Sequence, residues 1–248
     1  MEADLIYITG DTHNTLDMSN VSGKHIRFCC KNLQADYKRI STVIILGDFG
    51  LPWYKCPVDE NGIQPTNPTE KYLLKWYKSK PFTILAVMGN HDNYDMIANL
   101  PEVEMFDGMV FKVSENIFYL KRGEVYLIEG KSFLVLGGAM SDDKVYRTPH
   151  ESWWEQEELS LKEKEHCIEK IKQYGCCFDY VLSHTGPRKG ISVFDDSEIK
   201  DTTVAFNDEV EAMISYKKWF FGHWHSDWGF NNYENSRFVP LYHMGIVL

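Results

Sequence analysis

The chain has 248 residues, of which 44% are hydrophobic and 25% charged, and its formal net charge is −10. This composition is typical of a globular protein. No run of about 18 apolar residues is present, so we expect no membrane contact. The first apolar run begins at Leu5, which leaves no room for a signal peptide. The acidic balance argues against binding of duplex nucleic acid, which requires clustered Lys and Arg.

The six cysteines form no Cys-x-x-Cys pair. Reduced thiols are usual in the cytosol, so we expect a cytoplasmic protein. The length, together with the absence of repeats and low-complexity tracts, predicts a single domain over residues 1–248.

The first part of the chain alternates strand-like and helix-like patterns. Apolar runs at 5–8, 42–46 and 82–88 predict strands. Between them, apolar residues recur at helical spacing over 26–37 and 72–77. The resulting order β-α-β-α-β predicts a parallel sheet.

The middle of the chain has a different pattern. Residues 103–136 contain several short apolar runs separated by tight turns, which predicts antiparallel strands. The proline-rich segment 51–68 is typical of a surface loop.

The last third of the chain returns to alternating elements. Ser160 and Glu163 form a possible capping box for a helix that runs to about Tyr174. Apolar runs at 179–183 and 218–221 predict two more strands, each leading directly into histidine.

Five of the predicted strands end in side chains that can bind a metal ion. These side chains are Asp11 and His13, Asp48, Asn90, His184, and His223 and His225. Ligands of α/β sheets bind at the carboxyl ends of strands, so we expect one crevice to hold all of them.

Taken singly, most of these motifs are weak. Asp11-x-His13 is more often a loop Asp that caps a helix, Gly47-Asp48 is common turn chemistry, and an isolated His184 is more often structural. The pair His223-x-His225 is stronger, because two histidines two positions apart at a strand end face the same side.

Taken together, the motifs favour a metal centre. Mixed Asp, Asn and His ligands suit Mn, Fe and Zn better than Ca, and no cysteine joins the set, which argues against a structural zinc site. Seven candidate ligands, one able to bridge, fit two ions about 3.5–4 Å apart.

The order of these motifs resembles the calcineurin-like metallophosphoesterase superfamily. The motifs are Asp11-x-His13, Gly47-Asp48, Gly89-Asn90-His91-Asp92, His184 and Gly222-His223-x-His225. The runs 46–53 and 137–139 are also similar to small bacterial and phage members of that superfamily. The resemblance implies an α/β fold, a four-layer α-β-β-α sandwich of two mixed β-sheets, with the metals at the top of the two sheets.

The resemblance also implies a role for each residue. Asp11, His13 and His225 would hold a first ion, Asn90, His184 and His223 a second, and Asp48 would bridge them. A hydroxide bridging two divalent ions would attack phosphorus, while His91 would act as general acid or transition-state donor. Manganese is the first choice of metal, and Fe, Zn, Ni and Mg are alternatives.

The second motif departs from the pattern Gly-Asp-x-x-Asp-Arg-Gly of phosphoprotein phosphatases. Leu51 and Pro52 occupy the second Asp and the Arg positions, so His91 lacks that orienting carboxylate and the site lacks that phosphate-clamping Arg. Asp92 is an alternative orienting group. A calcineurin-type protein phosphatase is therefore the less favoured subtype.

Two residues are candidate substrate contacts. Arg147, in the loop 138–150, is the candidate for holding a phosphate oxygen, and a solvated loop is the alternative. Trp53 could wall the pocket, and a packed loop aromatic is the alternative. The pair Trp153-Trp154 is more typical of a core or an interface. Three histidines lack motif context and are interpreted as structural: His25, His166 and His243.

The sequence therefore predicts a metal-dependent hydrolase of small phosphodiesters or phosphomonoesters, including nucleotide-type esters. Two alternatives remain open: a metal-dependent nuclease, and a non-catalytic metal-binding interaction module on the same fold. The acidic balance weighs against the nuclease, and the complete set of ligands weighs against the non-catalytic module.

Overall fold

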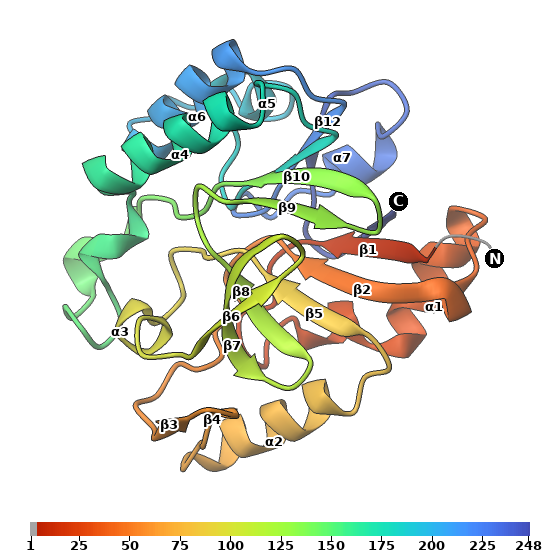
Figure 1. The fold of residues 1–248 in the computed structure, drawn as a ribbon. Coiled ribbons are helices and arrows are strands. Elements are labelled where there is room, and N and C mark those ends of the chain that lie inside the picture. Colours follow the sequence, from red (N-terminus) through yellow and green to blue (C-terminus); the bar gives the residue numbers. More distant parts are fainter. Residues whose placement is uncertain (1–3) are drawn as a thin grey trace.

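The computed structural model of the protein describes residues 4–248 and contains two packed β-sheets (Figure 1). The larger sheet has the order β14-β1-β2-β5-β8-β7-β6, and the smaller one has the order β13-β12-β11-β10-β9. The strands of the larger sheet are β1 (Leu5–Thr9), β2 (Ile40–Ile45), β5 (Thr83–Ala86), β6 (Glu102–Met105), β7 (Gly108–Ser114), β8 (Ile117–Leu120) and β14 (Ile246–Val247). Those of the smaller sheet are β9 (Val125–Ile128), β10 (Lys131–Val135), β11 (Tyr180–Leu182), β12 (Lys218–Phe221) and β13 (Phe238–Pro240).

Both sheets are mixed. In the larger sheet, β1, β2, β5 and β8 run parallel, while β14, β7 and β6 are antiparallel to their neighbours. In the smaller sheet, β10 to β13 run parallel and β9 is antiparallel to β10. The predicted antiparallel strands of the middle segment are therefore confirmed, but they are divided between the two sheets.

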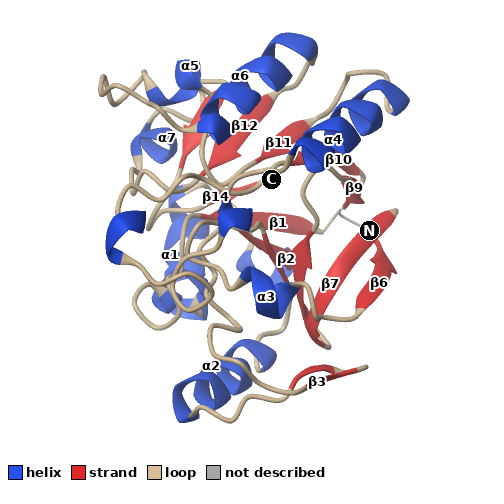
Figure 2. Cartoon of the chain, turned by 90° about the vertical axis from the view of Figure 1, so that its left-hand side faces the viewer, coloured by secondary structure: helices blue, strands red, loops and turns tan. Residues whose placement is uncertain are grey.

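Helices cover the outer faces of both sheets (Figure 2). They are α1 (Gly23–Asn32), α2 (Pro68–Lys78), α3 (Tyr94–Ile97), α4 (Leu161–Gln173), α5 (Arg188–Ile191), α6 (Thr202–Met213) and α7 (Trp228–Asn231). Helices α1 and α2 lie on the side of the larger sheet, and α4 and α6 on the side of the smaller one. Within residues 4–248, no helix is long and apolar enough to cross a membrane.

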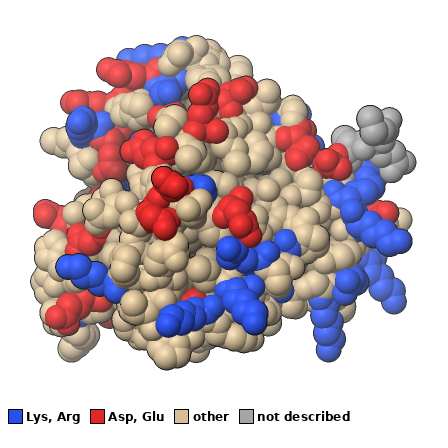
Figure 3. All heavy atoms as spheres, turned by 60° about the horizontal axis from the view of Figure 1, so that its bottom comes forward, with Lys and Arg blue, Asp and Glu red and all other residues tan. Residues whose placement is uncertain are grey.

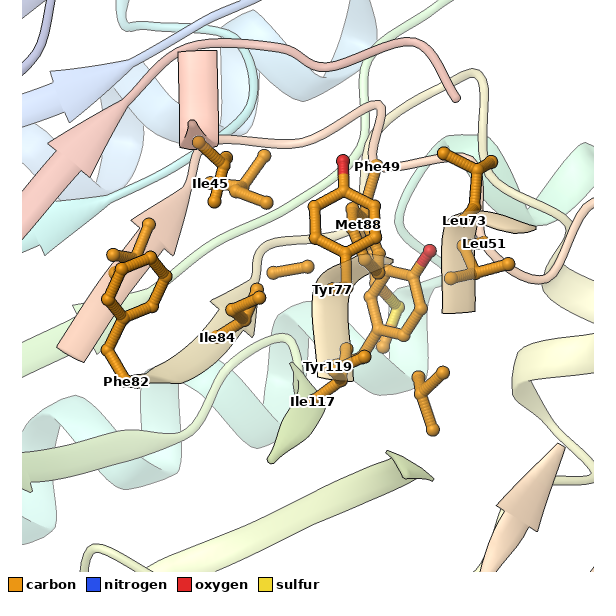
Figure 4. Close-up of a cluster of buried hydrophobic side chains, with 14 of the residues drawn as sticks. Ile45, Phe49, Leu51, Leu73, Tyr77, Phe82, Ile84, Met88, Ile117 and Tyr119 are labelled. Atoms are coloured by element: carbon orange, nitrogen blue, oxygen red, sulfur yellow. The ribbon is translucent and has the colours of Figure 1, made fainter. Parts of the chain in front are cut away.

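The alternation of side chains along the strands explains the layers. In β1 and β2, Tyr7 and Val43 pack in one buried cluster with residues of α1 and α2, part of which Figure 4 shows. Their neighbours Ile8 and Ile44 pack in a second cluster together with Phe220 of the smaller sheet. Successive residues of a strand point to opposite faces, so the larger sheet is buried on both sides.

A third cluster lies between the smaller sheet and its helices, where Trp219 of β12 packs with Ile171 of α4 and Val210 of α6. The three clusters separate four layers, and the predicted α-β-β-α sandwich of two mixed sheets is confirmed.

Two local predictions need correction. Helix α1 ends at Asn32, earlier than the helical pattern to residue 37 predicts, because Gln34 has a positive φ of 54° that no helix can continue through. The segment 51–68, predicted as a surface loop, also contains the hairpin of β3 (Val58–Asp59) and β4 (Gly62–Ile63).

Candidate metal centre

The seven predicted ligands come together where the two sheets meet. They follow β1, β2 and β5 of the larger sheet and β11 and β12 of the smaller one. These residues include two groups of potential metal ligands. Asp11, His13 and His225 form the first group, and Asp11, Asp48 and His184 form the second. Within each group, the ligand atoms all lie within 4.8 Å of one another. The predicted ligands thus lie in one place, but the strands that carry them belong to two sheets and not to one.

The first group has two histidines around Asp11. His225 Nε2 lies 3.2 Å from Asp11 Oδ2. The rings of His13 and His225 are 4.9 Å apart and nearly perpendicular. His13 Nε2 lies 3.4 Å from Asp48 Oδ2, so Asp48 reaches this group as well.

The second group is centred on His184, which is fully buried. Its Nδ1 lies 2.7 Å from the carbonyl oxygen of Leu46, and since a carbonyl can only accept, Nδ1 carries the proton of the neutral ring. Its Nε2 faces Asn90 Oδ1 at 2.9 Å and Asp48 Oδ1 at 3.2 Å. The His223 ring lies 5.0 Å from the His184 ring.

The chemistry of these atoms fits cations. On the neutral His184 ring, the Nε2 lone pair points at two oxygen atoms that are themselves acceptors. A proton or a metal ion between these lone pairs removes their repulsion. Histidines that ligate metals usually donate their other ring N–H to a carbonyl or a carboxylate, as His184 does to Leu46.

The close approach of carboxylates and histidines also shifts the pKa values of the histidines. Burial lowers the pKa of His184, but the nearby Asp48 carboxylate outweighs burial and raises it to about 10. Burial likewise opposes protonation of His13, while its contacts with Asp48 raise its pKa to about 9. Burial and the neighbouring His184 lower the pKa of His223 to about 3. The carboxylates thus attract positive charge to the places where ions would bind.

Several ligand residues have strained backbones. The φ angle is 42° at His13, 50° at Asp48, 64° at His223 and 47° at His225. Non-glycine residues adopt such values rarely and at a cost of about 1–3 kcal/mol, and they cluster at functional sites. Each strained residue directs its side chain from a tight turn just after a strand.

Glycines leave room for the buried carboxylates. A Cβ atom at Gly89 would lie 2.1 Å from Asp48 Oδ1, and one at Gly222 would lie 2.1 Å from Asp11 Oδ1. Neither distance is possible for real atoms, so the glycines that precede Asn90 and His223 in the sequence motifs are required for close approach of the backbone.

His91 lies beside both groups without belonging to either. Its backbone N–H donates to Asp48 Oδ1 at 2.7 Å, and its ring lies 5.8 Å from that of His13. Arg147 Nη2 donates to His91 Nε2 at 2.8 Å. The Arg147 side chain is only 9% exposed and pairs with Asp143 at 2.7 Å, so the structure places it at the centre rather than in solvent.

Asp92 does not take the orienting role considered for it. Its carboxylate accepts from the backbone N–H groups of Gly50 and Gly89 and from the Tyr119 hydroxyl. Within residues 4–248, the His91 ring donates no hydrogen bond to Asp92. The carboxylate instead ties together the loops that follow β2 and β5.

Trp53 packs edge to face against Trp154 with ring centroids 5.4 Å apart, and its carbonyl accepts from Asn93. This arrangement is the packed loop aromatic considered as the alternative to a pocket wall. Trp154 is buried, as expected for a core residue.

Two residues around the first group carry no motif and are absent from the sequence prediction. Asp17 Oδ2 lies 2.9 Å from His13 Nδ1, and the Tyr242 ring stacks on His225 with centroids 4.3 Å apart. The short spacing of four residues between His13 and Asp17 is the only sequence signal that could have indicated the contact between these two side chains.

The sequence model described as calcineurin-like phosphoesterase matches residues 5–227. The chain belongs to the calcineurin-like phosphoesterase family. Membership implies a hydrolase that acts on phosphoester bonds with the help of divalent metals, and the two ligand groups of this phosphoesterase agree with that chemistry.

No protein of curated function matches this phosphoesterase in sequence. One similar solved structure is "GAP50 the anchor in the inner membrane complex of Plasmodium", with a TM-score of 0.43 and 11% identity. The match covers 90% of the present chain and 66% of that chain.

Proposed function

We propose that this phosphoesterase hydrolyses small phosphodiesters or phosphomonoesters at a centre of two divalent metal ions. The observation that carries the proposal is the convergence of two overlapping groups of ligand atoms from strand ends of both sheets. Asp48 presents one oxygen to His13 of the first group and the other to His184 of the second, which supports a bridging role.

The donor set suggests how the ions would be held. Asp11, His13 and His225 would hold the first ion, and Asn90, His184 and His223 the second. Nitrogen and oxygen donors without sulfur favour Mn, with Fe, Zn, Ni and Mg as alternatives. When bound, the ions supply Lewis acidity and lower the pKa of water toward about 7.

Arg147 and His91 would act on the substrate itself. The guanidinium of Arg147 can hold a phosphoryl oxygen by a charge-assisted hydrogen bond. In the structure it donates to His91 Nε2, so the proton of the neutral His91 ring is on Nδ1. Burial lowers the pKa of His91, which keeps the ring neutral. If Arg147 turns toward the phosphate, the lone pair of His91 Nε2 becomes free to take up a proton from water, and the ring would then give that proton to the leaving oxygen.

The charge of the protein supports a small substrate. The net charge is −10. Figure 3 shows both acidic and basic side chains on one face, with the acidic ones mostly in its upper and left parts and the basic ones mostly in its lower part and on the right. We therefore expect a small phosphate ester rather than duplex nucleic acid as the partner.

A cytoplasmic location is part of the proposal. The six cysteines are unpaired. Free thiols of this kind are stable in a reducing compartment, which supports the cytoplasm.

The test is hydrolysis of bis-p-nitrophenyl phosphate and p-nitrophenyl phosphate by metal-free protein titrated with Mn²⁺. We expect activity on at least one ester, rising to saturation near two ions per chain, and the preferred ester distinguishes diesterase from monoesterase. Failure to bind two ions would overturn the dinuclear centre. Two bound ions without hydrolysis of either ester would contradict the proposed activity and favour the metal-binding interaction module.

A further inference from the structure

A second layer of polar and aromatic groups lies behind the histidines of the first ligand group. We propose that Asp17 and Tyr242 are positioning residues, which together hold His13 and His225 in ligand geometry and so set the affinity of the first metal position. The inference rests on the proposed two-metal function and concerns how one of the two ions is retained.

Asp17 fixes the orientation of His13. Asp17 Oδ2 lies 2.9 Å from His13 Nδ1, and because a carboxylate only accepts, Nδ1 is the protonated nitrogen. The other ring nitrogen, Nε2, then faces Asp48 at 3.4 Å, in the direction of the proposed ions. A carboxylate behind a ligating histidine fixes its tautomer and makes it a stronger ligand.

Tyr242 connects Asp17 to the second histidine. Its hydroxyl donates to Asp17 Oδ2 at 3.3 Å. Its ring stacks on His225 with centroids 4.3 Å apart and planes inclined by 14°. The side chain of His225 is 48% exposed, and across residues 4–248 no hydrogen bond holds its Nδ1. Stacking on Tyr242 therefore restricts rotation of this ring, in addition to the contacts of His225 with Asp11 and His13.

Tyr242 is itself held firmly to the centre. Its backbone N–H donates to Asp227 Oδ1 at 2.9 Å. The buried Asn20 donates from Nδ2 both to the Tyr242 carbonyl, at 3.2 Å, and to the Asp11 carbonyl, at 3.1 Å. The loop that carries Tyr242 is thus tied to the backbone of a metal ligand, and the stacked ring has a fixed position relative to Asp11.

Within residues 4–248, the ligands of the second metal position are supported by groups other than Asp17 and Tyr242. Asn90 Nδ2 donates to Ser141 Oγ at 3.0 Å. His184 is fully buried and donates to the backbone carbonyl of Leu46, which no side-chain substitution removes. Loss of Asp17 or Tyr242 should therefore weaken one of the two ions and spare the other. A general loss of folding would weaken both.

The experiment is a Mn²⁺ titration of metal-free full-length protein, in which electron paramagnetic resonance measures free Mn²⁺. The variants are Asp17→Ala, Asp17→Asn, Tyr242→Ala and Tyr242→Phe, and Tyr72→Ala on the exposed face of α2 is the control. Thermal unfolding of each metal-free variant shows whether the fold is retained.

We expect Asp17→Ala and Tyr242→Ala to bind one ion as the wild type does and the other about 10–100-fold more weakly. Asp17→Asn keeps an acceptor and Tyr242→Phe keeps the stacked ring, so both should lose less affinity than the alanine variants. Tyr72→Ala should bind both ions normally.

The outcomes separate this inference from the proposed function. If the wild type binds two ions and the Asp17 and Tyr242 variants bind both with unchanged affinity, or weaken both equally, the positioning role is wrong while the dinuclear centre stands. If the wild type itself binds fewer than two ions, both proposals fall.

Discussion

His91 is placed to act on the substrate and not on the metals. It lies outside both groups of ligand atoms, and its ring nitrogen receives a hydrogen bond from Arg147. We expect His91→Ala to lower kcat by about 10²–10⁴-fold, the usual contribution of a general acid, with little change in metal content. The measurement is kcat on the preferred nitrophenyl ester together with elemental analysis of the same sample. Loss of metal in this variant would show that His91 is a ligand.

Asp48 should behave in the opposite way. Each of its oxygens faces a histidine of a different group, and it is buried. Asp48→Ala removes the bridge, so we expect the variant to lose bound Mn²⁺ and its activity together. Elemental analysis after dialysis measures this loss. Retention of two ions by Asp48→Ala would contradict the bridging role, and His91→Ala is the matched control for general damage to the centre.

At the scale of elements, the sequence allowed prediction of the strand ends but not of their sheets. The runs that became β8 and β9 are both short and apolar, yet β8 pairs with β5 in the larger sheet and β9 with β10 in the smaller one. Local periodicity carries no information about that choice, because pairing partners are selected by tertiary packing.

The convergence of the candidate ligands was predictable because each lies within a few residues of the end of an apolar run, in a turn with its own sequence signal. The groups behind them were not. Asp17 and Tyr242 are separated by 225 residues in the chain, and neither belongs to a motif. Their contact exists only because the loops after β1 and β13 fold against each other, as the bonds from Asn20 to both loops show.

Helix α4 illustrates an element whose start was predictable in detail. The capping box of Ser160 and Glu163 is confirmed. The structure adds that Glu163 also pairs with Arg122, a buried cation whose presence could not be inferred from the sequence around the helix. One carboxylate thus caps the start of the helix and neutralises a buried charge in the connection between β8 and β9.

The second role of Glu163 makes a pH-dependent prediction. Burial raises the pKa of this carboxyl, but Arg122 and the hydrogen bonds from Ser160 together shift the pKa downward. A carboxyl with a lowered pKa stabilises the fold above its unfolded value, about 4.3, and that stabilisation is lost as the pH falls through its folded value.

Glu163→Gln keeps the capping geometry and removes the charge. We expect it to lower the free energy of unfolding at pH 7 by about 1–3 kcal/mol, the range for a buried charged donor that loses its ionised partner. The difference from the wild type should shrink as the pH is lowered below about 4. Urea unfolding at both pH values measures it. An equal difference at both would assign the loss to packing rather than charge.

At the scale of the whole molecule, the fold concentrates charge where its two halves meet. The two sheets are joined by an apolar cluster, and the buried carboxylates Asp11 and Asp48 lie at the end of that cluster, on loops from the larger sheet. His184 and His223 approach them from the smaller sheet. Cations bound at this position would therefore link the two sheets, and protons on the histidines would compete with them.

This competition makes ion binding depend on pH. The pKa values of about 9 for His13 and about 10 for His184 lie above neutrality, so we expect both rings to be cationic at pH 7.5 in the ion-free protein, with a second proton on Nε2. A metal ion needs the lone pair of Nε2, and binding must release those protons. Affinity for Mn²⁺ should therefore rise as the pH is raised toward the pKa values of His13 and His184, above which both histidines are neutral.

Isothermal titration calorimetry measures the release directly. At pH 7.5 we expect the heat of Mn²⁺ binding to vary linearly with the ionisation enthalpy of the buffer, with a slope of about two protons, one from each raised histidine. Asp48→Ala removes the carboxylate that raises both pKa values, so any binding that remains should release fewer protons. A heat of binding that does not depend on the buffer would contradict this prediction. It would show that His13 and His184 are already neutral in the ion-free protein and that no histidine proton competes with the metal ions.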